Sequence, residues 1–146
     1  MKTAADLLKS KLHQTVFTIA PTATVFDAVK LMADKDIGAL LVMEGEQVAG
    51  IFTERDYARK IALMSRSSRD TPVRDVMTPE VMYVRPDQTS EECMALMTAN
   101  RLRHLPVMDG RRLLGLVSIG DLVKDIISDQ QFTIQQLEHY ITGERG

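Results

Sequence analysis

An internal repeat is the feature of this sequence that most constrains its fold. Residues 16–61 align with residues 81–126 at a constant shift of 65 and without a gap, and 12 of the 46 aligned positions are identical. Such self-similarity indicates two copies of one supersecondary unit, each too small to bury its apolar faces alone. We therefore expect two copies packed face to face about a pseudo-two-fold axis, with one shared core and two equivalent clefts at the seam.

Each copy has the pattern strand–helix–strand–strand–helix, which predicts an α/β (α+β) fold. A short turn joins the last two strands, and Gly45 or Gly110 supplies the positive φ that a hairpin favours. The second helices are expected over residues 54–63 and 119–127. The expected strands cover residues 16–19, 39–43 and 48–52 in the first copy, and 81–84, 105–108 and 113–117 in the second.

The first helix of each copy begins with the spacing of a capping box. Thr24 precedes Asp27 by three residues, and Thr89 precedes Glu92 by three. In this motif the hydroxyl accepts a backbone N–H and the acidic side chain accepts the N–H of the capping residue. An apolar stripe at helical spacing follows each cap and predicts the buried face: Ala28, Leu31 and Met32 in one copy, and Cys93, Leu96 and Met97 in the other.

The remaining chain consists of a linker and two terminal segments. Residues 64–70 are polar, and Thr71 is expected to cap a short helical turn with Pro72 at its first position. Amphipathic helices are expected over residues 3–12 and 132–141, the second ending at Gly143. The expected organisation is an N-terminal helix with the first repeat (1–63), a linker with a short helix (64–80), the second repeat (81–127) and a C-terminal helix (128–146), all in one compact module.

Composition excludes several classes of function. Eighteen basic and 20 acidic residues give a net charge of −2, whereas a protein that grips nucleic acid normally carries a basic excess. The apolar runs are far shorter than the roughly 20 residues of a membrane-spanning helix, and the N-terminal residues show no secretory signal. Cys93 is the only cysteine, so neither an internal disulfide nor a multi-thiolate metal site is expected. We expect a cytoplasmic protein without nucleic-acid or membrane partners.

A repeated hydroxyl–carboxylate motif carries the chemical information. Thr53 and Asp56 follow one strand as a helix begins, and Ser118 and Asp121 follow the equivalent strand. Residues three apart share a helix face, the free N–H groups of the helix end attract anions, and a carboxylate suits the vicinal diol of a ribose. The pair could thus hold a ribonucleotide. Thr-x-x-Asp is also an ordinary helix cap, and taken alone the motif favours that interpretation.

Other reactive residue types give weaker signals. Of the three histidines, His13 and His139 are expected on the surface, whereas His104 fits either a strand edge or a phosphate contact. Cys93 lies on an apolar stripe and is expected in the core. No serine–histidine–aspartate set, paired acid–base carboxylates or phosphate-binding glycine loop is present in the sequence. Neither an enzyme nor a metal site is therefore expected.

The doubled unit resembles a tandem pair of CBS domains, the Bateman module, and the match covers residues 16–126 in the manner of the stand-alone bacterial type. This resemblance implies a regulatory module that binds adenosine nucleotides, commonly AMP, ADP, ATP, NAD or S-adenosylmethionine, in the clefts between repeats. The matching motifs are Pro21-x-x-Thr24 and Pro86-x-x-Thr89, the Leu–Met pairs, Leu40-Leu41-Val42 and Leu105-Pro106-Val107, and the Gly-h-x-Thr/Ser-x-x-Asp ends, where h is apolar.

The resemblance also implies which residues bind the ligand. Asp56 and Asp121 would bind ribose, with Thr53 and Ser118 beside phosphate. Arg55 has no counterpart in the second copy, and Arg103 and His104 have none in the first, so the two clefts are expected to be unequal. The adenine would lie against apolar positions of the opposite repeat: Val16, Phe17, Ile37 and Gly38 for one cleft, and Met77, Val81, Met82, Leu102 and Arg103 for the other.

Two functions remain open from the sequence, and a third, a nucleic-acid or enzymatic role, is disfavoured by the acidic balance and the missing catalytic residues. In the first, the module senses a nucleotide and modulates an unidentified partner protein or its own oligomeric state. A homodimer is expected there, because the exposed helices of such modules commonly pair into a flat disc. In the second, the chain is a structural interaction or dimerisation module whose clefts are vestigial. Nucleotide titration separates the two, because only the first predicts binding.

Overall fold

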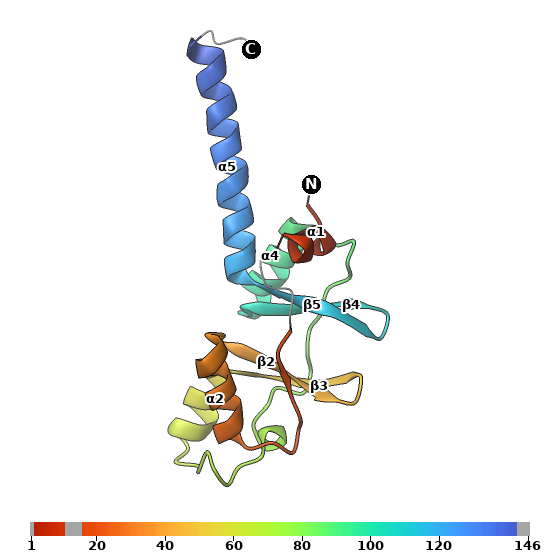
Figure 1. Ribbon diagram of the computed structural model, residues 1–146, viewed down its shortest axis with the longest axis vertical. Helices are drawn as coiled ribbons and strands as arrows, with labels where there is room; N and C mark the ends of the chain where they lie inside the picture. Colours follow the sequence, from red (N-terminus) through yellow and green to blue (C-terminus); the bar gives the residue numbers. More distant parts are fainter. Residues whose placement is uncertain (1, 11–15, 143–146) are drawn as a thin grey trace.

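The fold consists of two stacked halves and one projecting helix (Figure 1). The computed structural model describes residues 2–10 and 16–142, with side chains described as far as residue 138. The strand–helix–strand–strand–helix pattern is confirmed in the first half, and the second half keeps the same order with its first strand reduced to a single bridge. The first half contains β1 (Thr18–Ile19), α2 (Val25–Lys35), β2 (Ala39–Glu44), β3 (Gln47–Thr53) and α3 (Glu54–Asp56). The second contains α4 (Ser90–Asn100), β4 (His104–Asp109), β5 (Arg112–Ser118) and α5 (Ile119–Thr142).

The two sheets differ in their first strand. In the first half β1 pairs in parallel with β2, and β2 pairs antiparallel with β3. In the second half only β4 and β5 form a sheet, and the expected strand over residues 81–84 is wrong: it reduces to a single parallel bridge at Val84. Pro106 stands where β2 has Leu41, and proline has no N–H with which to extend the parallel ladder.

The hairpins and helix ends of the two halves correspond closely. Gly45 and Gly110 have φ values of 63° and 61°, as the hairpin pattern predicts. Each hairpin also carries a register irregularity at the equivalent point of its first strand. Asp36 and Arg101 end the first helices in the left-handed conformation, both at φ 54°. A left-handed residue at this point is a common way to stop a helix and turn the chain.

The caps of the first helices are only partly alike. The hydroxyls of Thr24 and Thr89 each accept the backbone N–H three residues ahead, at 3.1 Å. The acidic half of the capping box is made by Glu92, whose carboxylate accepts the Thr89 N–H at 3.3 Å. The helix α2 carries the hydroxyl bond only, so the expected full box at Asp27 is wrong.

The two halves exchange the segments that precede them. The short helix α1 (Ala4–Lys9) packs against β5, α4 and α5 of the second half, where Ala4 and Leu7 are buried. The 3₁₀ turn η2 (Val73–Asp75), which precedes the second half, instead contributes Val73 to the core of the first, together with Val76. The structure therefore has two core clusters rather than the single shared core that we expected, and each is completed by a segment from outside its own repeat.

Equivalent contacts hold both exchanged segments. Gly50 and Gly115 allow the close approach: a Cβ at Gly50 would lie 2.7 Å from the Met77 Sδ and 2.8 Å from the Thr78 carbonyl oxygen, and one at Gly115 would lie 2.7 Å from a Leu8 methyl carbon. The backbone N–H groups of Ala4 and Ala5 donate to Gln88 (2.8 Å) and Pro86 (3.0 Å), and those of Val73 and Arg74 donate to Ala23 (2.8 Å) and Pro21 (3.0 Å).

Several expected helix boundaries are corrected by the structure. The second helix of the first half continues after α3 as a π-helical segment, η1 (Tyr57–Ala62). Pro72 precedes η2 rather than occupying its first position, and Thr71 does not cap it through its side chain. The two helices expected over residues 119–127 and 132–141 are one continuous helix, α5, because no proline or glycine interrupts residues 121–142. Gly143 lies outside the described residues. Within the described residues, no helix is long and apolar enough to span a membrane.

Candidate functional site

A cleft of about 1050 Å³ lies between the two halves. One of its walls comes from the first half, at the chain entering β1 and at the turn between α2 and β2. The other comes from the second half, at the end of β5 and the first turns of α5, with α1 alongside. Seven of the predicted site residues line it: Val16, Phe17, Ile37, Gly38, His104, Ser118 and Asp121.

The wall from the first half is mainly apolar. Phe17 and Ile37 are half-buried and pack against the first core cluster while facing the cleft. The Lys35 ammonium lies 5.4 Å from the centre of the Phe17 ring, within the range of a cation–π contact. This wall therefore offers an aromatic and aliphatic surface bordered by the ammonium of Lys35 and the carboxylates of Asp34 and Asp36.

The opposite wall presents a capped helix end. The Asp121 Oδ2 accepts the Ser118 N–H at 2.8 Å, and the Ser118 Oγ accepts the Asp121 N–H at 3.2 Å. These reciprocal bonds fix the hydroxyl and the carboxylate side by side on the cleft wall. The Ile119 N–H is already bonded to the Arg103 carbonyl oxygen at 2.8 Å. The polar wall is thus rigid, with its hydrogen-bonding groups placed before any ligand arrives.

Charged side chains of both signs surround the cleft. Lys2 forms an ion pair with the buried Asp125, and this hydrogen bond raises the pKa of Lys2 above its ordinary value. Lys35 and Lys124 also line the cleft. These cations are balanced by carboxylates nearby, so the lining is polar and mixed rather than strongly basic.

In the first half, the carboxylate of the equivalent motif is hydrogen-bonded and ion-paired to other groups of the protein. The Asp56 Oδ2 accepts the Thr53 N–H at 3.0 Å and the Thr53 hydroxyl at 3.2 Å. Its Oδ1 accepts the Thr78 hydroxyl at 3.2 Å and lies 3.2 Å from the Lys60 ammonium. Asp56 is only 7% exposed. A ligand could reach this carboxylate only by displacing protein partners.

The other residues predicted to bind ligand on the Asp56 side do not line the 1050 Å³ cleft. Arg55 is exposed and donates from Nη1 to the Arg101 carbonyl oxygen at 3.2 Å, which joins the two halves. Met77 packs on Gly50 at the edge of the first core, and Leu102 packs on the second core. Val81 is half-buried, whereas Met82 and Arg103 are exposed.

Sequence reasoning missed the contribution of the N-terminal segment. Lys2, Leu7, Leu8 and Ser10 line the cleft because α1 packs on the second half. These residues precede the aligned repeat, so its 65-residue shift carries no signal for them. Gly115 is the one local clue, because a strand glycine often marks a close backbone approach.

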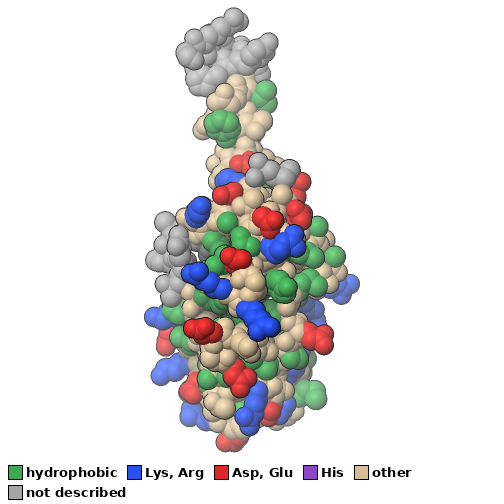
Figure 2. All heavy atoms as spheres, turned by 90° about the vertical axis from the view of Figure 1, so that its right-hand side faces the viewer, with side chains coloured by type: hydrophobic (Ala, Val, Ile, Leu, Met, Phe, Trp, Pro, Cys, Tyr) green, Lys and Arg blue, Asp and Glu red, His purple; other side chains and the backbone are tan. Residues whose placement is uncertain are grey.

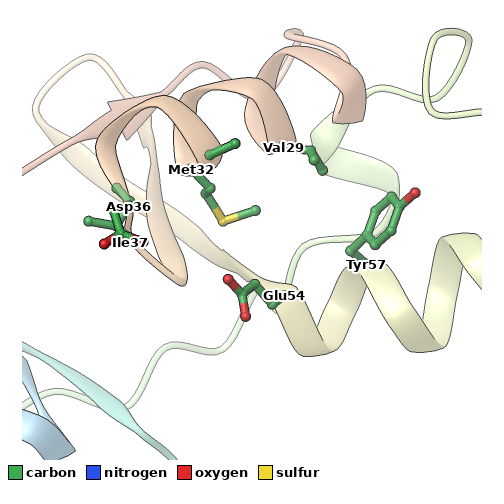
Figure 3. Close-up of a pocket in the computed structure, with 7 residues that line it drawn as sticks. Val29, Met32, Asp36, Ile37, Glu54 and Tyr57 are labelled. Atoms are coloured by element: carbon green, nitrogen blue, oxygen red, sulfur yellow. The ribbon is translucent and has the colours of Figure 1, made fainter.

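A second, smaller cavity lies in the first half between α2 and α3 (Figure 3). The side chains of Val29, Met32, Ile37, Glu54 and Tyr57 point around it. Its volume is about 190 Å³, whereas pockets for small molecules usually measure about 300–1000 Å³. The larger cleft is therefore the candidate ligand site.

The described side chains include neither a cluster of metal ligands nor an exposed thiol. In the part of the chain that the structure describes, no three His, Cys, Asp or Glu residues gather as metal ligands. Cys93 is fully buried, and burial raises the pKa of its thiol, which keeps it in the less reactive protonated form.

Comparison with known proteins agrees with the repeated architecture. A model of the CBS domain matches residues 4–63 and 73–128. A mitochondrial CBS domain-containing protein of Arabidopsis thaliana, CBSX3, is 42% identical over 149 residues, which cover 97% of this chain and 72% of the relative. The compartment of this chain stays a prediction.

Two solved structures show the same fold. A protein with CBS domains from Burkholderia ambifaria MC40-6 is 58% identical, with a TM-score of 0.86 over 91% of this chain and 99% of the other. The CBS domain pair of protein MJ0100, solved in complex with 5′-methylthioadenosine and S-adenosyl-L-methionine, has a TM-score of 0.77 over 88% of this chain and 98% of that chain. At 20% identity, the second likeness supports the fold alone.

The family match accounts for most of the chain and for both halves of the structure. Its boundaries include α1 in the first match and η2 in the second, which are the two exchanged segments. The Burkholderia relative, a signal-transduction protein with CBS domains, is matched over nearly its whole length. The chain therefore belongs to the CBS-domain family and is a tandem CBS pair, a regulatory rather than a catalytic module.

Proposed function

We propose that the 1050 Å³ cleft binds an adenosine nucleotide, and that its occupancy regulates a partner protein or the oligomeric state of this chain. The candidate ligands are AMP, ADP, ATP, NAD and S-adenosylmethionine. The observation that carries the proposal is the pairing of an apolar wall with a capped helix end across one cleft of suitable size. This arrangement matches a ligand with a flat base at one end and a polar sugar at the other.

Each part of such a ligand has a complementary group in the cleft. The base would lie against the apolar side chains of Phe17 and Ile37. The ribose hydroxyls would donate to the Asp121 carboxylate, and a phosphate would meet the Ser118 hydroxyl and the start of α5. His104, Lys35 and the other lysines at the edge supply cationic or donor groups for the remaining charge.

The family supports the chemical class of this ligand. Both molecules in the MJ0100 complex contain an adenosine moiety. That protein shares the fold of this chain at low identity, so its ligands narrow the choice of probes and do not name the ligand here.

The Asp56 side stays a prediction as a second binding site. Thr53, Arg55, Met77, Val81, Met82, Leu102 and Arg103 are assigned to it by family resemblance alone. Because Asp56 already accepts four hydrogen bonds or ion contacts within the protein, the proposal assigns the first molecule of ligand to the Asp121 side.

Regulation would follow from differential affinity. A ligand that touches both halves stabilises the relative arrangement in which both walls fit it, and it shifts the equilibrium by the ratio of its affinities for the two arrangements. A partner protein or a second copy that contacts one arrangement better would then respond to the ligand.

Calorimetric titration of the intact chain tests the proposal. The probes are AMP, ADP, ATP, NAD and S-adenosylmethionine, and at least one is expected to bind more tightly than about 1 mM, or roughly −4 kcal/mol. Asp121→Ala removes the ribose acceptor and should weaken that binding at least about 10-fold. Asp109→Ala is the matched control, because this exposed aspartate lies at the far end of β4.

The alternative function, a structural module with vestigial clefts, gives a different result. It predicts that none of the five probes binds the parent chain at millimolar concentration. Binding that is equal in the parent and in Asp121→Ala would contradict the assigned site while leaving a nucleotide-binding role intact.

A further inference from the structure

The described residues that line the 1050 Å³ cleft carry nearly balanced charge. Four aspartates and three lysines give the lining a formal charge of −1 when His104 is neutral. No arginine, the side chain that binds phosphate in a bidentate manner, is among these lining residues. Acidic and basic side chains are also interspersed over the face of the molecule in Figure 2. The charged lining residues are Asp34, Asp36, Asp121, Asp125, Lys2, Lys35 and Lys124.

The lysine from the N-terminal segment is already paired within the protein. The Lys2 ammonium forms an ion pair with Asp125, which is only 8% exposed. If Lys2 turned to a ligand, it would leave this carboxylate buried without its ion-pair partner, which costs stability. Lys2 therefore contributes little charge toward an anionic ligand.

The other two lysines stand close to carboxylates. Lys35 is exposed at the end of α2, and its chain neighbours Asp34 and Asp36 line the cleft beside it. Lys124 is exposed on α5, three residues after Asp121, so the two share a helix face. Each ammonium thus has a carboxylate near it that opposes its attraction for phosphate. The lining suits a ligand of small negative charge.

The helix end in the cleft has limited capacity for phosphate oxygens. The N–H groups of Ser118 and Asp121 donate within the cap, at 2.8 and 3.2 Å, and the Ile119 N–H donates to the Arg103 carbonyl oxygen at 2.8 Å. Anion sites at helix ends depend on such N–H groups being available. The Ser118 hydroxyl accepts in the cap and keeps its own hydrogen to donate. This arrangement fits one phosphate group better than a chain of them.

We propose that the cleft selects adenosine ligands by their phosphate charge, binding a monophosphate and disfavouring each further phosphate. The inference rests on the proposed function, because it takes the positions of the base and the ribose from that site. Each further phosphate adds about one negative charge, and the lysines of the lining are already matched by carboxylates. A site built for polyphosphate would instead gain a contact with each added group.

Calorimetric titration of the intact chain with AMP, ADP and ATP, without divalent cations, tests the selection. Affinity is expected to fall in that order, with ATP at least about 10-fold weaker than AMP. Raising the salt concentration from about 50 to about 300 mM should narrow this difference, because screening weakens the repulsion of the extra charge. In a site built from cations, the same change would weaken ATP more than AMP.

A charge-neutralising variant tests the source of the selection. Asp34→Asn combined with Asp36→Asn should narrow the ratio of AMP to ATP affinity at least about threefold. Asparagine suits position 36, where φ is 54°, so the variant should keep the fold. Glu46→Gln combined with Asp109→Asn is the matched control, because it removes two exposed carboxylates from the hairpin ends, outside the cleft lining. Circular dichroism checks that both variants remain folded.

The outcomes separate this inference from the proposed function. ATP that binds as tightly as AMP, or more tightly, overturns the selection and leaves nucleotide binding intact. The same holds if AMP fails to bind while NAD or S-adenosylmethionine binds. A control variant that narrows the ratio as much as the cleft variant would assign the effect to the net charge of the chain and overturn the inference. Binding of none of the probes contradicts the proposed function and the inference together.

Discussion

Asp56 and Asp121 occupy the same point of the repeated fold and have different surroundings. Both carboxylates accept the N–H of the hydroxyl residue three positions earlier, at 3.0 and 2.8 Å. Four residues further along the helix, the first half has Lys60, which pairs with Asp56, whereas the second half has Asp125, which pairs with Lys2. Asp56 is therefore buried and paired with a lysine one helical turn away, whereas Asp121 lines the large cleft.

This difference shows that the two copies share the local geometry of the motif but not the surroundings of its carboxylate. The backbone geometry of a strand end and a helix start is retained in both copies, because the cap stabilises the helix whether or not a ligand is present. The groups that surround the carboxylate, and whether it borders the large cleft, differ between the two copies. A duplicated motif thus preserves structure more readily than binding.

The largest expected effect is on nucleotide binding when Asp121 is replaced, whereas replacing Asp56 should mainly lower the stability of the fold. Asp121→Ala should weaken nucleotide binding about 30- to 100-fold, because charge-assisted hydrogen bonds to the ribose are lost. Asp56→Ala should change affinity less than about threefold but lower the free energy of unfolding by about 2–3 kcal/mol, because it leaves buried donors unpaired. Calorimetry and urea unfolding measure the two effects. The comparison fails if both substitutions weaken binding equally.

Replacing the two strand glycines, Gly50 and Gly115, by alanine should lower the free energy of unfolding by different amounts. Gly50→Ala places a Cβ against the backbone oxygen of Thr78, which is held in paired hydrogen bonds with Ile51, and should destabilise by about 3 kcal/mol. Gly115→Ala meets only the end of the Leu8 side chain, which can rotate, and should cost about 1 kcal/mol. Urea unfolding of both variants checks the order. A larger cost at Gly115 would show that α1 holds its position more rigidly than Met77 and Thr78, the residues that follow η2.

Removing the ammonium beside Asp56 should have a smaller effect. Lys60 is about half exposed and also donates to the Val76 carbonyl oxygen at 3.0 Å. Lys60→Met should therefore lower the free energy of unfolding by less than about 1 kcal/mol, because solvent screens the pair. If the ammonium occupies a competent binding position, the variant should also gain a second, weak nucleotide site by calorimetry. A single site in parent and variant alike would leave Asp56 purely structural.

The smallest expected effect compares the caps of α2 and α4. The hydrogen bond from the Thr89 backbone lowers the pKa of the Glu92 carboxyl below its ordinary value of 4.5. Its contribution to stability is therefore complete above that value and is lost as the pH falls through the lower, folded-state pKa. Glu92→Gln should flatten the loss of stability between about pH 5 and pH 3. Asp27→Asn in α2 is the control, because this cap carries the Thr24 hydroxyl bond only, and thermal unfolding of both variants across this range measures the effect.

The periodic parts of the fold could be predicted from the sequence because they depend on local chemistry. Gly45 and Gly110 require positive φ, and Thr24 and Thr89 are favoured as caps whatever surrounds them. The boundaries that failed depend on other residues. The strand at Val84 is shortened by Pro106, which belongs to a different segment of the chain. The continuity of α5 follows from the absence of any helix breaker rather than from its apolar pattern.

The site was less predictable than the fold. The hydroxyl–carboxylate pairs were visible in the sequence, but the partners of Asp56 include Thr78, which lies 22 residues away. The charged lining of the cleft depends on Lys2, whose place is set by the exchange of α1 into the second half. Long-range packing of this kind leaves no periodic signal.

The uninterrupted helix α5 has a mechanical consequence. It begins beside the Ser118–Asp121 pair at the cleft and runs for 24 residues to the projecting end. At 1.5 Å per residue this is a rod of about 36 Å, and beyond Gly120 in its first turn no proline or glycine interrupts it, so it is expected to bend only gently. A tilt of about 10° at the first turn would displace the far end by about 6 Å over that length. A small change of the helix angle at the cleft would therefore move the exposed apolar side chains at the far end of α5 by several ångströms.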